Sequence, residues 1–374
     1  MSDVGATELI ALQGVTPQKL VSLLPEITLA EARRVVATVN ADGDIRLPHA
    51  GVRRGSRELL CARGYVPTLG IQSTQKSNYD GFLKLGFQTH EGRVVEAVRI
   101  PLAQTGRYSV CVSSQVGCAL ACTFCATGRM GLGRNLETWE IVEQVRIMRS
   151  TLDRKRGERV HGVVFQGMGE PLSNFERVAE AVRVLSESSA LAVDMRNITV
   201  STAGLPAGIR RLAEELPNAR LAWSIGSARD AVRTSLMPIN RAHPLEETYA
   251  AVCEHTRTTG HSPLWAVTLL QGVNDSDADA LALAELALRF RRDTARSPRI
   301  SVIPYNPITD DSSDPFQRVD EDGERRFREV MKSAGVFTHR RYSGGGDVSA
   351  ACGQLSAKAA AGERSPPPVN GGWI

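Results

Sequence analysis

Apolar and polar positions alternate in three different ways along this chain, and each pattern predicts a different kind of element. Up to about residue 65, leucines recur at helical spacing and residues 31–39 carry a second apolar stripe, which predicts a set of short helices. Residues 82–87 and 94–100 are apolar runs separated by the turn residues Glu91 and Gly92, which predicts a β-hairpin.

From about residue 110 to 340, short apolar runs alternate with longer stretches of helical periodicity. The runs expected to be strands are residues 163–165, 198–201, 221–224, 265–269, 300–303 and 336–337. The expected helices are residues 137–152, 175–186, 207–215, 245–258, 279–291 and 321–334. This alternation predicts an α/β fold with a parallel sheet, open or closed into a barrel. In such folds the functional loops follow the carboxyl ends of the strands.

Length and composition are those of a globular protein of two or three domains, or of one large domain with additions. The chain has 374 residues, of which 42% are hydrophobic and 23% charged. No run of 18 apolar residues occurs, which excludes a membrane-spanning helix of ordinary length and predicts no membrane partner. The first residues lack a basic region ahead of an apolar stretch, so we expect no secretory signal and a cytoplasmic location. Residues from 357 onward are rich in Ala, Pro and Gly and are expected to be disordered.

The net charge of +4 is too small to identify an acidic partner, but the basic residues are unusual in kind. Only six of the 45 are lysine, and arginine suits phosphate recognition and base stacking. Codon bias in a GC-rich genome produces the same composition. The local clusters are Arg46, Arg53, Arg54, Arg57 and Arg63, and Arg289, Arg291, Arg292, Arg296 and Arg299. Each cluster is either a nucleic-acid contact or a solvated face.

Three of the seven cysteines fall close together. Cys118, Cys122 and Cys125 have the spacing C-x3-C-x2-C, and a long chain without export features favours reduced thiols. A structural zinc ion takes four protein ligands, and no fourth cysteine or histidine follows at short range. A [4Fe–4S] cluster accepts three thiolates and keeps one iron open for a small molecule. The spacing favours this cluster over buried structural cysteines.

Further stretches around these cysteines make the pattern more specific. They are residues 111–118, 124–128, 134–136, 167–172, 201–204, 237–240, 303–307 and 350–355. Taken in order, they resemble the RlmN/Cfr family of radical S-adenosylmethionine (SAM) RNA adenine methyltransferases. The resemblance implies a partial (β/α)6 TIM-type radical SAM barrel at residues 106–345. An N-terminal accessory module (residues 1–105, helical plus hairpin) precedes it, and a C-terminal segment (residues 346–374) follows.

The resemblance also implies roles for individual residues. Cys118, Cys122 and Cys125 would hold the [4Fe–4S] cluster. The residues that would bind SAM are Gly169, Glu170, Ser201, Ser224, Ile225, Gly226 and Asn306. Cys352 would carry the methyl group, Cys111 would form a transient disulfide with it, and Glu96 would accept a proton. From the residues alone, Cys352 is an inert buried thiol, Glu96 an exposed strand carboxylate, and Gly167–Glu170 either a ligand-binding loop or a plain turn.

The sequence departs from the family at two places, one among the predicted SAM-binding residues and one shortly before Cys352. Ser224-Ile225-Gly226 stands where the family commonly has Ser-Leu-His, so a cofactor contact at Gly226 would involve backbone only. Residues 343–348 have fewer charges than their counterparts in the family, which predicts a more mobile loop.

The function implied by the resemblance is methylation of an adenine carbon, C2 with C8 as the alternative, in 23S rRNA, tRNA or both. The implied partners are RNA and an electron donor such as flavodoxin or ferredoxin. Two other hypotheses remain: the same chemistry on another acceptor, and a non-catalytic iron–sulfur RNA-binding protein. Retention of Cys111, Glu96 and Cys352 favours catalysis, since a binding protein needs none of them.

Overall fold

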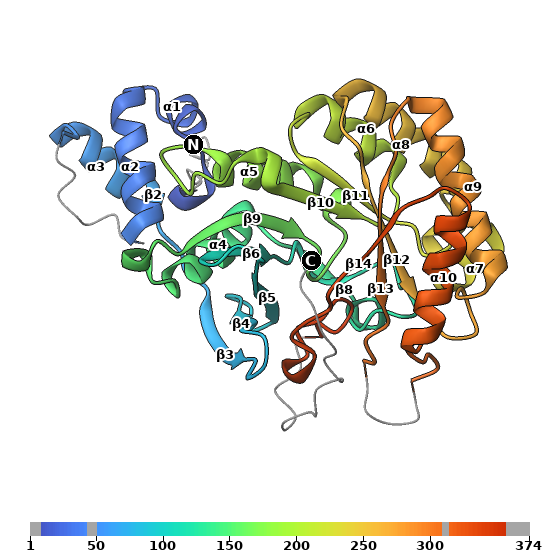
Figure 1. Ribbon diagram of the computed structural model, residues 1–374. Coiled ribbons are helices and arrows are strands. Elements are labelled where there is room, and N and C mark those ends of the chain that lie inside the picture. The colour runs from blue at the N-terminus through green and yellow to red at the C-terminus, as the bar shows by residue number, and fades with distance from the viewer. Residues whose placement is uncertain (1–8, 43–50, 309–313, 357–374) are drawn as a thin grey trace, which may run out of the picture.

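A ten-stranded sheet forms the centre of the computed structural model, which describes residues 9–42, 51–308 and 314–356 (Figure 1). Its strands are β3 (Gly70–Lys76), β4 (Leu83–Gln88), β5 (Val94–Pro101), β6 (Arg107–Cys111), β9 (Arg159–Phe165), β10 (Ile198–Thr202), β11 (Arg220–Ser224), β12 (Leu264–Leu269), β13 (Arg299–Pro304) and β14 (Thr338–Arg340). They are ordered β14-β13-β12-β11-β10-β9-β6-β5-β4-β3. From β6 to β14 every neighbouring pair is parallel, whereas β3 to β6 pair antiparallel.

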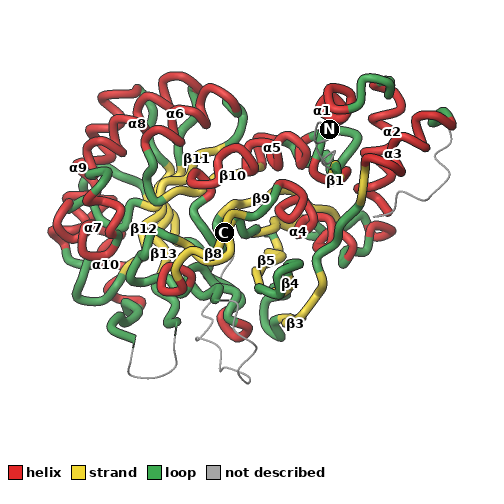
Figure 2. Tube along the Cα trace, turned by 180° about the vertical axis from the view of Figure 1, so that it is seen from behind, coloured by secondary structure: helices red, strands yellow, loops and turns green. Residues whose placement is uncertain are grey.

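Helices connect the parallel strands and cover one face of the sheet (Figure 2). They are α4 (Thr138–Ser150), α5 (Phe175–Ser186), α6 (Pro206–Glu215), α7 (Asp230–Leu236), α8 (Leu245–Thr259), α9 (Asp277–Thr294) and α10 (Glu321–Ser333). All but the short α7 were predicted to within a few residues. Trp223, Trp265 and Phe290 pack edge to face between sheet and helices, with ring centroids 5.4 and 5.2 Å apart. The six strand–helix units confirm the predicted partial (β/α)6 barrel.

Two elements differ from the sequence expectation. The final strand was predicted at residues 336–337, but β14 begins at Thr338. The N–H of Val336 donates to the carbonyl of Met331 in α10 at 3.0 Å, so it is not available to the sheet, and the side chain of Phe337 is 77% exposed. A two-stranded sheet of β7 (Gln115–Cys118) and β8 (Gly131–Asn135) was not predicted. Its strands are short and rich in glycine, so they carry no apolar alternation.

The N-terminal helices have a hydrophobic core of their own. They are α1 (Pro17–Leu23), α2 (Leu29–Asp42) and α3 (Arg54–Arg63), and short strands β1 (Ile10–Ala11) and β2 (Gly64–Tyr65) pair beside them. Arg53, from the first arginine cluster, forms an ion pair of 2.8 Å with the buried Glu31, whose pKa it lowers. This arginine therefore stabilises the packing of α2 against the start of α3. Arg46 of the same cluster lies outside the described residues.

The predicted hairpin is confirmed as β4 and β5, and it continues the barrel sheet. Gly86 lies opposite Glu96, and on the other side of β5 Val98 lies opposite Cys111. The buried side chains of β4 and β5 belong to the same hydrophobic core as the barrel. The division at residue 105 stays a prediction.

None of the helices within the described ranges combines the length and the apolar character that crossing a membrane would require. The tail expected to be disordered, from residue 357, lies outside those ranges.

Candidate active site

The cysteine motif lies in the loop between β7 and β8. Cys118 ends β7, and the chain then turns through Ala121, which has a φ of 52°. The backbone N–H of Cys125 donates to the carbonyl of Cys122 at 3.2 Å, which closes a tight turn between the last two cysteines. Gly128 packs over this turn, since a Cβ there would lie 2.7 Å from the Cys122 carbonyl oxygen. The loop conformation is thus fixed by contacts of its own backbone.

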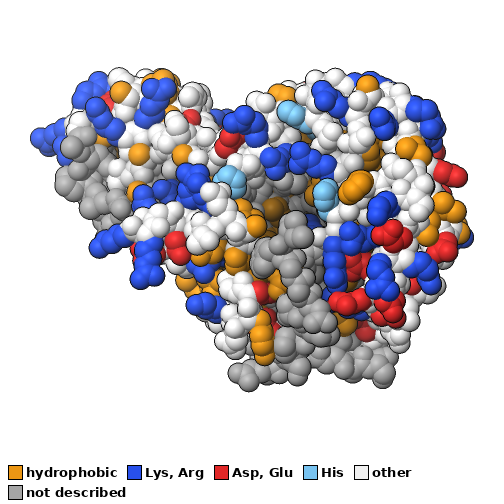
Figure 3. All heavy atoms as spheres, viewed as in Figure 1, with side chains coloured by type: hydrophobic (Ala, Val, Ile, Leu, Met, Phe, Trp, Pro, Cys, Tyr) orange, Lys and Arg blue, Asp and Glu red, His pale blue; other side chains and the backbone are white. Residues whose placement is uncertain are grey.

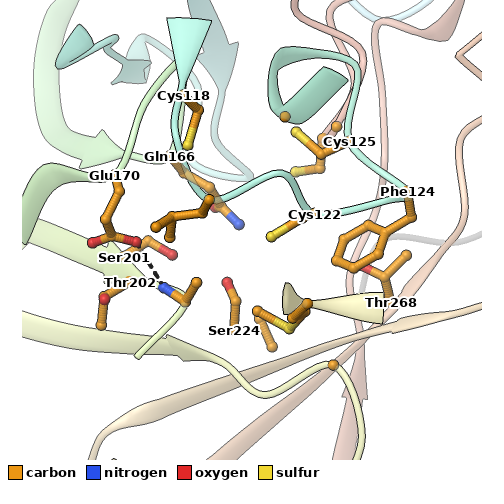
Figure 4. Close-up of a pocket in the computed structure, with 18 of the residues that line it drawn as sticks. Cys118, Cys122, Phe124, Cys125, Gln166, Glu170, Ser201, Thr202, Ser224 and Thr268 are labelled. Atoms are coloured by element: carbon orange, nitrogen blue, oxygen red, sulfur yellow. Dashed lines mark hydrogen bonds between the residues drawn. The ribbon is translucent and has the colours of Figure 1, made fainter. Parts of the chain in front are cut away.

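All three cysteines face one cavity with about 970 Å³ of empty volume, part of it open to solvent (Figure 4). Within the described part of the chain, no three His, Cys, Asp or Glu side chains are close enough to hold one metal ion. A structural zinc ion takes four protein ligands, whereas this loop offers three thiols. An iron–sulfur cluster is larger and accepts thiolates spaced around it. The three-thiol donor set therefore fits a cluster.

Burial raises the pKa of all three thiols, that of Cys118 to about 11. A cluster would reverse this effect, because a bound iron deprotonates a coordinating thiol.

The Gly167–Glu170 loop crosses the end of β9 opposite the cysteines. Gly169 has a φ of +99°, and a Cβ there would lie 2.6 Å from the Cβ of Gln115. A Cβ on Gly167 would lie 2.6 Å from the carbonyl oxygen of Val112. Both positions therefore require glycine, and the close backbone packing presents Glu170 to the cavity.

Glu170 is a buried carboxylate with partly satisfied oxygens. Its Oε1 accepts from the N–H of Leu172 at 3.0 Å, and its Oε2 accepts from the N–H of Ala203 at 2.9 Å. Its own N–H donates to the side chain of Gln115 at 2.8 Å. Burial raises the pKa of Glu170 to about 7, although these hydrogen bonds oppose the shift. A cationic ligand in the cavity would compensate its charge.

The remaining predicted cofactor residues divide into two groups. Ser201, Ser224 and Gly226 line the cavity at the carboxyl ends of β10 and β11. In the described chain, Ile225 and Asn306 are not among the lining residues. Ile225 is buried in the core, and its carbonyl accepts a hydrogen bond from Arg233. The Nδ2 of Asn306 donates to Ser343 Oγ at 2.7 Å and to the carbonyl of Cys352 at 3.1 Å.

A buried arginine at this site was missed by the sequence analysis. Arg233, on α7, is fully buried and donates to the carbonyls of Ala203 (2.5 Å) and Ser224 (3.2 Å), both of which line the cavity. Burial lowers its pKa to about 10, so it stays cationic at neutral pH. It ties the ends of β10 and β11 together. Its position four residues before the Met237–Asn240 motif was the available signal.

A second, smaller cavity adjoins the first, and Cys352 lines both. Cys111, Gln166 and Arg341 line the smaller one. Cys111 is buried, and this burial, together with the neighbouring Cys352, raises its pKa to about 12. Cys352 itself is half-buried, so the interpretation from the residues alone is wrong about its burial, and its reactivity stays a prediction. Of the two unassigned cysteines, Cys61 is exposed and Cys253 is buried on α8.

Glu96 is buried, which contradicts its interpretation as an exposed strand carboxylate. Its Oε1 lies 3.1 Å from the Nζ of Lys84, and its Oε2 accepts from the N–H of Ser356 at 2.9 Å. Within the described residues it is not part of the lining of either cavity.

We predict that Glu170 accepts hydrogen bonds from the ammonium group of SAM. Replacing Glu170 by glutamine is therefore expected to weaken SAM binding about 10- to 100-fold, through loss of the charged acceptor. Wild-type affinity should fall as the pH is lowered from 8 to 6, because a carboxyl with a pKa of about 7 becomes neutral over that range. The variant should lack this dependence. Calorimetric titration of SAM into anaerobic, cluster-loaded protein measures both effects. Glu254→Gln, at the exposed surface of α8, is the control and should match the wild type.

Comparison with known proteins agrees with this geometry. Residues 112–284 match the model of the radical SAM superfamily. The family implies a [4Fe–4S] cluster and SAM, so the two cofactors predicted from the sequence are confirmed, and the three cysteines and Glu170 line a cavity suited to them.

Similar proteins extend over nearly the whole chain. A probable RNA methyltransferase of Sorangium cellulosum is 54% identical over 364 residues, covering 91% of this chain and 92% of that protein. The dual-specificity RNA methyltransferase RlmN of an Anaeromyxobacter species is 38% identical over 325 residues, covering 85% and 83%. The crystal structure of a radical SAM methyltransferase from Sphaerobacter thermophilus superposes with a TM-score of 0.83 at 35% identity, covering 93% of this chain and all of that one. The chain therefore belongs to the RlmN-type family of radical SAM RNA methyltransferases.

Proposed function

We propose that this protein methylates a carbon of adenine in RNA, at C2 rather than C8, through a methyl-cysteine at Cys352. The observation that carries the proposal is that Cys352 lines both cavities. From one cavity its sulfur can reach a cofactor held near the three cysteines, and from the other it can reach Cys111. The relative from an Anaeromyxobacter species is a dual-specificity RNA methyltransferase, which supports two RNA specificities for this protein. In our proposal the two substrates are 23S rRNA and tRNA.

In this proposal the cavity residues bind and orient SAM. Cys118, Cys122 and Cys125 hold the cluster, which when bound supplies the electron for reductive cleavage of SAM. Glu170 accepts hydrogen bonds from the ammonium group, while Ser201, Ser224 and the backbone at Gly226 contact the rest of the cofactor. Asn306 and Ile225 act indirectly. Asn306 positions the Cys352 backbone through its hydrogen bond, and Ile225 packs in the core behind the cavity.

Release of the product depends on the second cysteine. Once the Cys352 sulfur is joined to the base through the transferred carbon, the Cys111 thiolate attacks that sulfur. A disulfide forms, the sulfur–carbon bond breaks, and its electron pair stays on the carbon, which then takes a proton. A thiol reductant must reduce the disulfide before the next cycle. Glu96 is the proposed acceptor for the proton lost from the base, after residues 349–356 move away from it.

Replacing Cys111 by serine is expected to leave methylation of Cys352 intact and to trap protein covalently on RNA. Because the pKa of Cys111 is raised to about 12, wild-type release should accelerate as the pH rises from 7 to 9. Denaturing gels of reactions with labelled RNA detect the trapped species. A Cys111→Ser protein that releases methylated RNA at the wild-type rate would remove Cys111 from the mechanism.

The surface supports an RNA partner. In the space-filling view Lys and Arg side chains dominate the charged positions over the N-terminal helices α1–α3, whereas acidic and basic side chains mix on the barrel (Figure 3). A hollow lies between the N-terminal part of the molecule and the barrel (Figure 3), and in this proposal a nucleotide enters there. An electron carrier such as flavodoxin or ferredoxin and a cytoplasmic location complete the proposal.

The alternatives are another methyl acceptor or a protein that binds RNA without catalysis. Mass spectrometry of anaerobically reconstituted protein incubated with SAM separates them. A methyl group on Cys352 supports the proposed carrier, and its absence despite SAM cleavage rejects it. If Cys352 is methylated but adenine in total RNA is not, the acceptor is a different one.

A further inference from the structure

A buried ion pair holds both ends of the stretch that contains Cys352. Lys84 and Glu96 lie on neighbouring strands β4 and β5, with side chains only 5% and 3% exposed and 3.1 Å between Nζ and Oε1. The Nζ of Lys84 donates to the carbonyl of Ser349 at 3.2 Å. The Oε2 of Glu96 accepts from the N–H of Ser356 at 2.9 Å. The pair thus contacts the backbone three residues before Cys352 and four residues after it.

The turn between β3 and β4 makes a second contact, with the glycine-rich loop upstream. The Oδ2 of Asp80 accepts from the hydroxyl of Tyr342 at 2.9 Å and from the N–H of Gly345 at 2.8 Å. Gly344 leaves no room for a side chain, since a Cβ there would lie 2.6 Å from the ring of Phe82. The glycine-rich loop, one of the two places where this chain departs from its family, is therefore closely packed against the turn that precedes β4.

The barrel contacts the same stretch from the opposite side. The N–H of Ala126, directly after the cysteine motif, donates to the carbonyl of Gly353 at 2.8 Å. Thr127 Oγ1 donates to the carbonyl of Leu355 at 2.5 Å. Residues 342–356, here named the carrier segment, are thus held between the antiparallel strands and the cysteine loop.

Burying a lysine and a glutamate together costs desolvation energy, and an ion pair recovers it only with good geometry and further hydrogen bonds. Here two of the further hydrogen bonds go to the carrier segment, at Ser349 and at Ser356. An ion pair that only stabilised the β4–β5 hairpin would not require them.

We propose that Lys84 is a positioning residue for methyl transfer. Together with Glu96 and Asp80 it fixes the carrier segment against strands β3–β5, so that Cys352 lines both cavities. The inference rests on the proposed function of Cys352. It assigns Glu96 a positioning role that comes before its proposed role as a base.

The test compares Lys84→Met with Lys84→Arg in the full, cluster-loaded protein. Lys84→Met is expected to slow methylation of Cys352 by about 10- to 100-fold, since small displacements of a reacting group have effects of this size. Iron content and reductive SAM cleavage should stay near wild type, and amides of residues 349–356 should exchange hydrogen faster. Lys84→Arg keeps a cation and donors and should recover most of the methylation. Lys332→Met, in an exposed ion pair on α10, is the matched control.

Glu96→Gln separates the two roles of Glu96. Glutamine still accepts a hydrogen bond from Ser356, so methylation of Cys352 should be slowed less than in Lys84→Met, whereas release of the RNA adduct should stop if Glu96 is the base.

If Lys84→Met does not fold, Tyr342→Phe at the half-exposed upstream contact gives the same readouts. Wild-type rates of Cys352 methylation and amide exchange in the folded Lys84 or Tyr342 variant would overturn the inference. Lack of Cys352 methylation in the wild type would instead reject the proposed function.

Discussion

Replacing Cys352 by alanine is expected to abolish RNA methylation, by at least about 1000-fold, while SAM is still cleaved reductively. Among the cysteines of the described chain, Cys352 alone lines both of these cavities, and Cys111 lines the smaller one with it. Removing it takes away the group that carries the methyl but none of the proposed cluster or cofactor ligands. The two activities are measured as methyl incorporation into RNA and as release of 5′-deoxyadenosine.

Alanine variants of the two unassigned cysteines are the controls. Cys61 is exposed on α3 and Cys253 is buried on α8, and neither lines a cavity within the described chain. Both variants should methylate RNA as the wild type does. Methylation by the Cys352→Ala protein at more than a few per cent of the wild-type rate would show that SAM donates the methyl without a cysteine carrier.

The fold was predictable from sequence where an element is buried uniformly, on both faces of a strand or along one face of a helix. Strands such as β12 are covered on both faces, so they are continuous apolar runs, and helices such as α5 carry one apolar stripe. The prediction was wrong at β14, where only one neighbouring strand pairs and the apolar Phe337 points to solvent. The β7–β8 hairpin was missed because glycine conformation and local hydrogen bonds shape it, and neither leaves an apolar pattern.

The site was predictable in part. The spacing of the three cysteines indicated a cluster, and the position of Gly167–Glu170 after a strand indicated a loop near a ligand. The residues alone could not predict that Cys111 and Cys352 line one cavity, because they are 241 positions apart and tertiary packing brings them together. The resemblance to the family implied that they meet. The burial of Glu96 and of Arg233 could not be predicted either, because the groups that compensate their charges come from other parts of the chain. Glu96 forms an ion pair with Lys84, and Arg233 donates to the carbonyl of Ala203.

The packing of the carrier segment connects these observations. Glu96 and Asn306 were both predicted to act directly, yet each has a hydrogen bond to the carrier segment and neither is part of the lining of a cavity in the described chain. Glu96 and Asn306 are thus placed to position the segment that carries Cys352, although their chemistry suggests a direct role. This is why the Cys352, Lys84 and Glu96 variants need separate readouts for cofactor cleavage, cysteine methylation and adduct release.

Replacing Cys118 by alanine is expected to remove the cluster and with it both activities. Cys118 is buried at the end of β7 and is one of the three proposed cluster ligands. Iron per protein should fall to about a tenth of the wild-type value or less, because a cubane cluster with two protein ligands is poorly held. Iron analysis, visible absorption and 5′-deoxyadenosine release measure the loss. Cys253→Ala, the buried control, should retain all three signals, and reductive SAM cleavage by the Cys118→Ala protein would reject the assigned ligands.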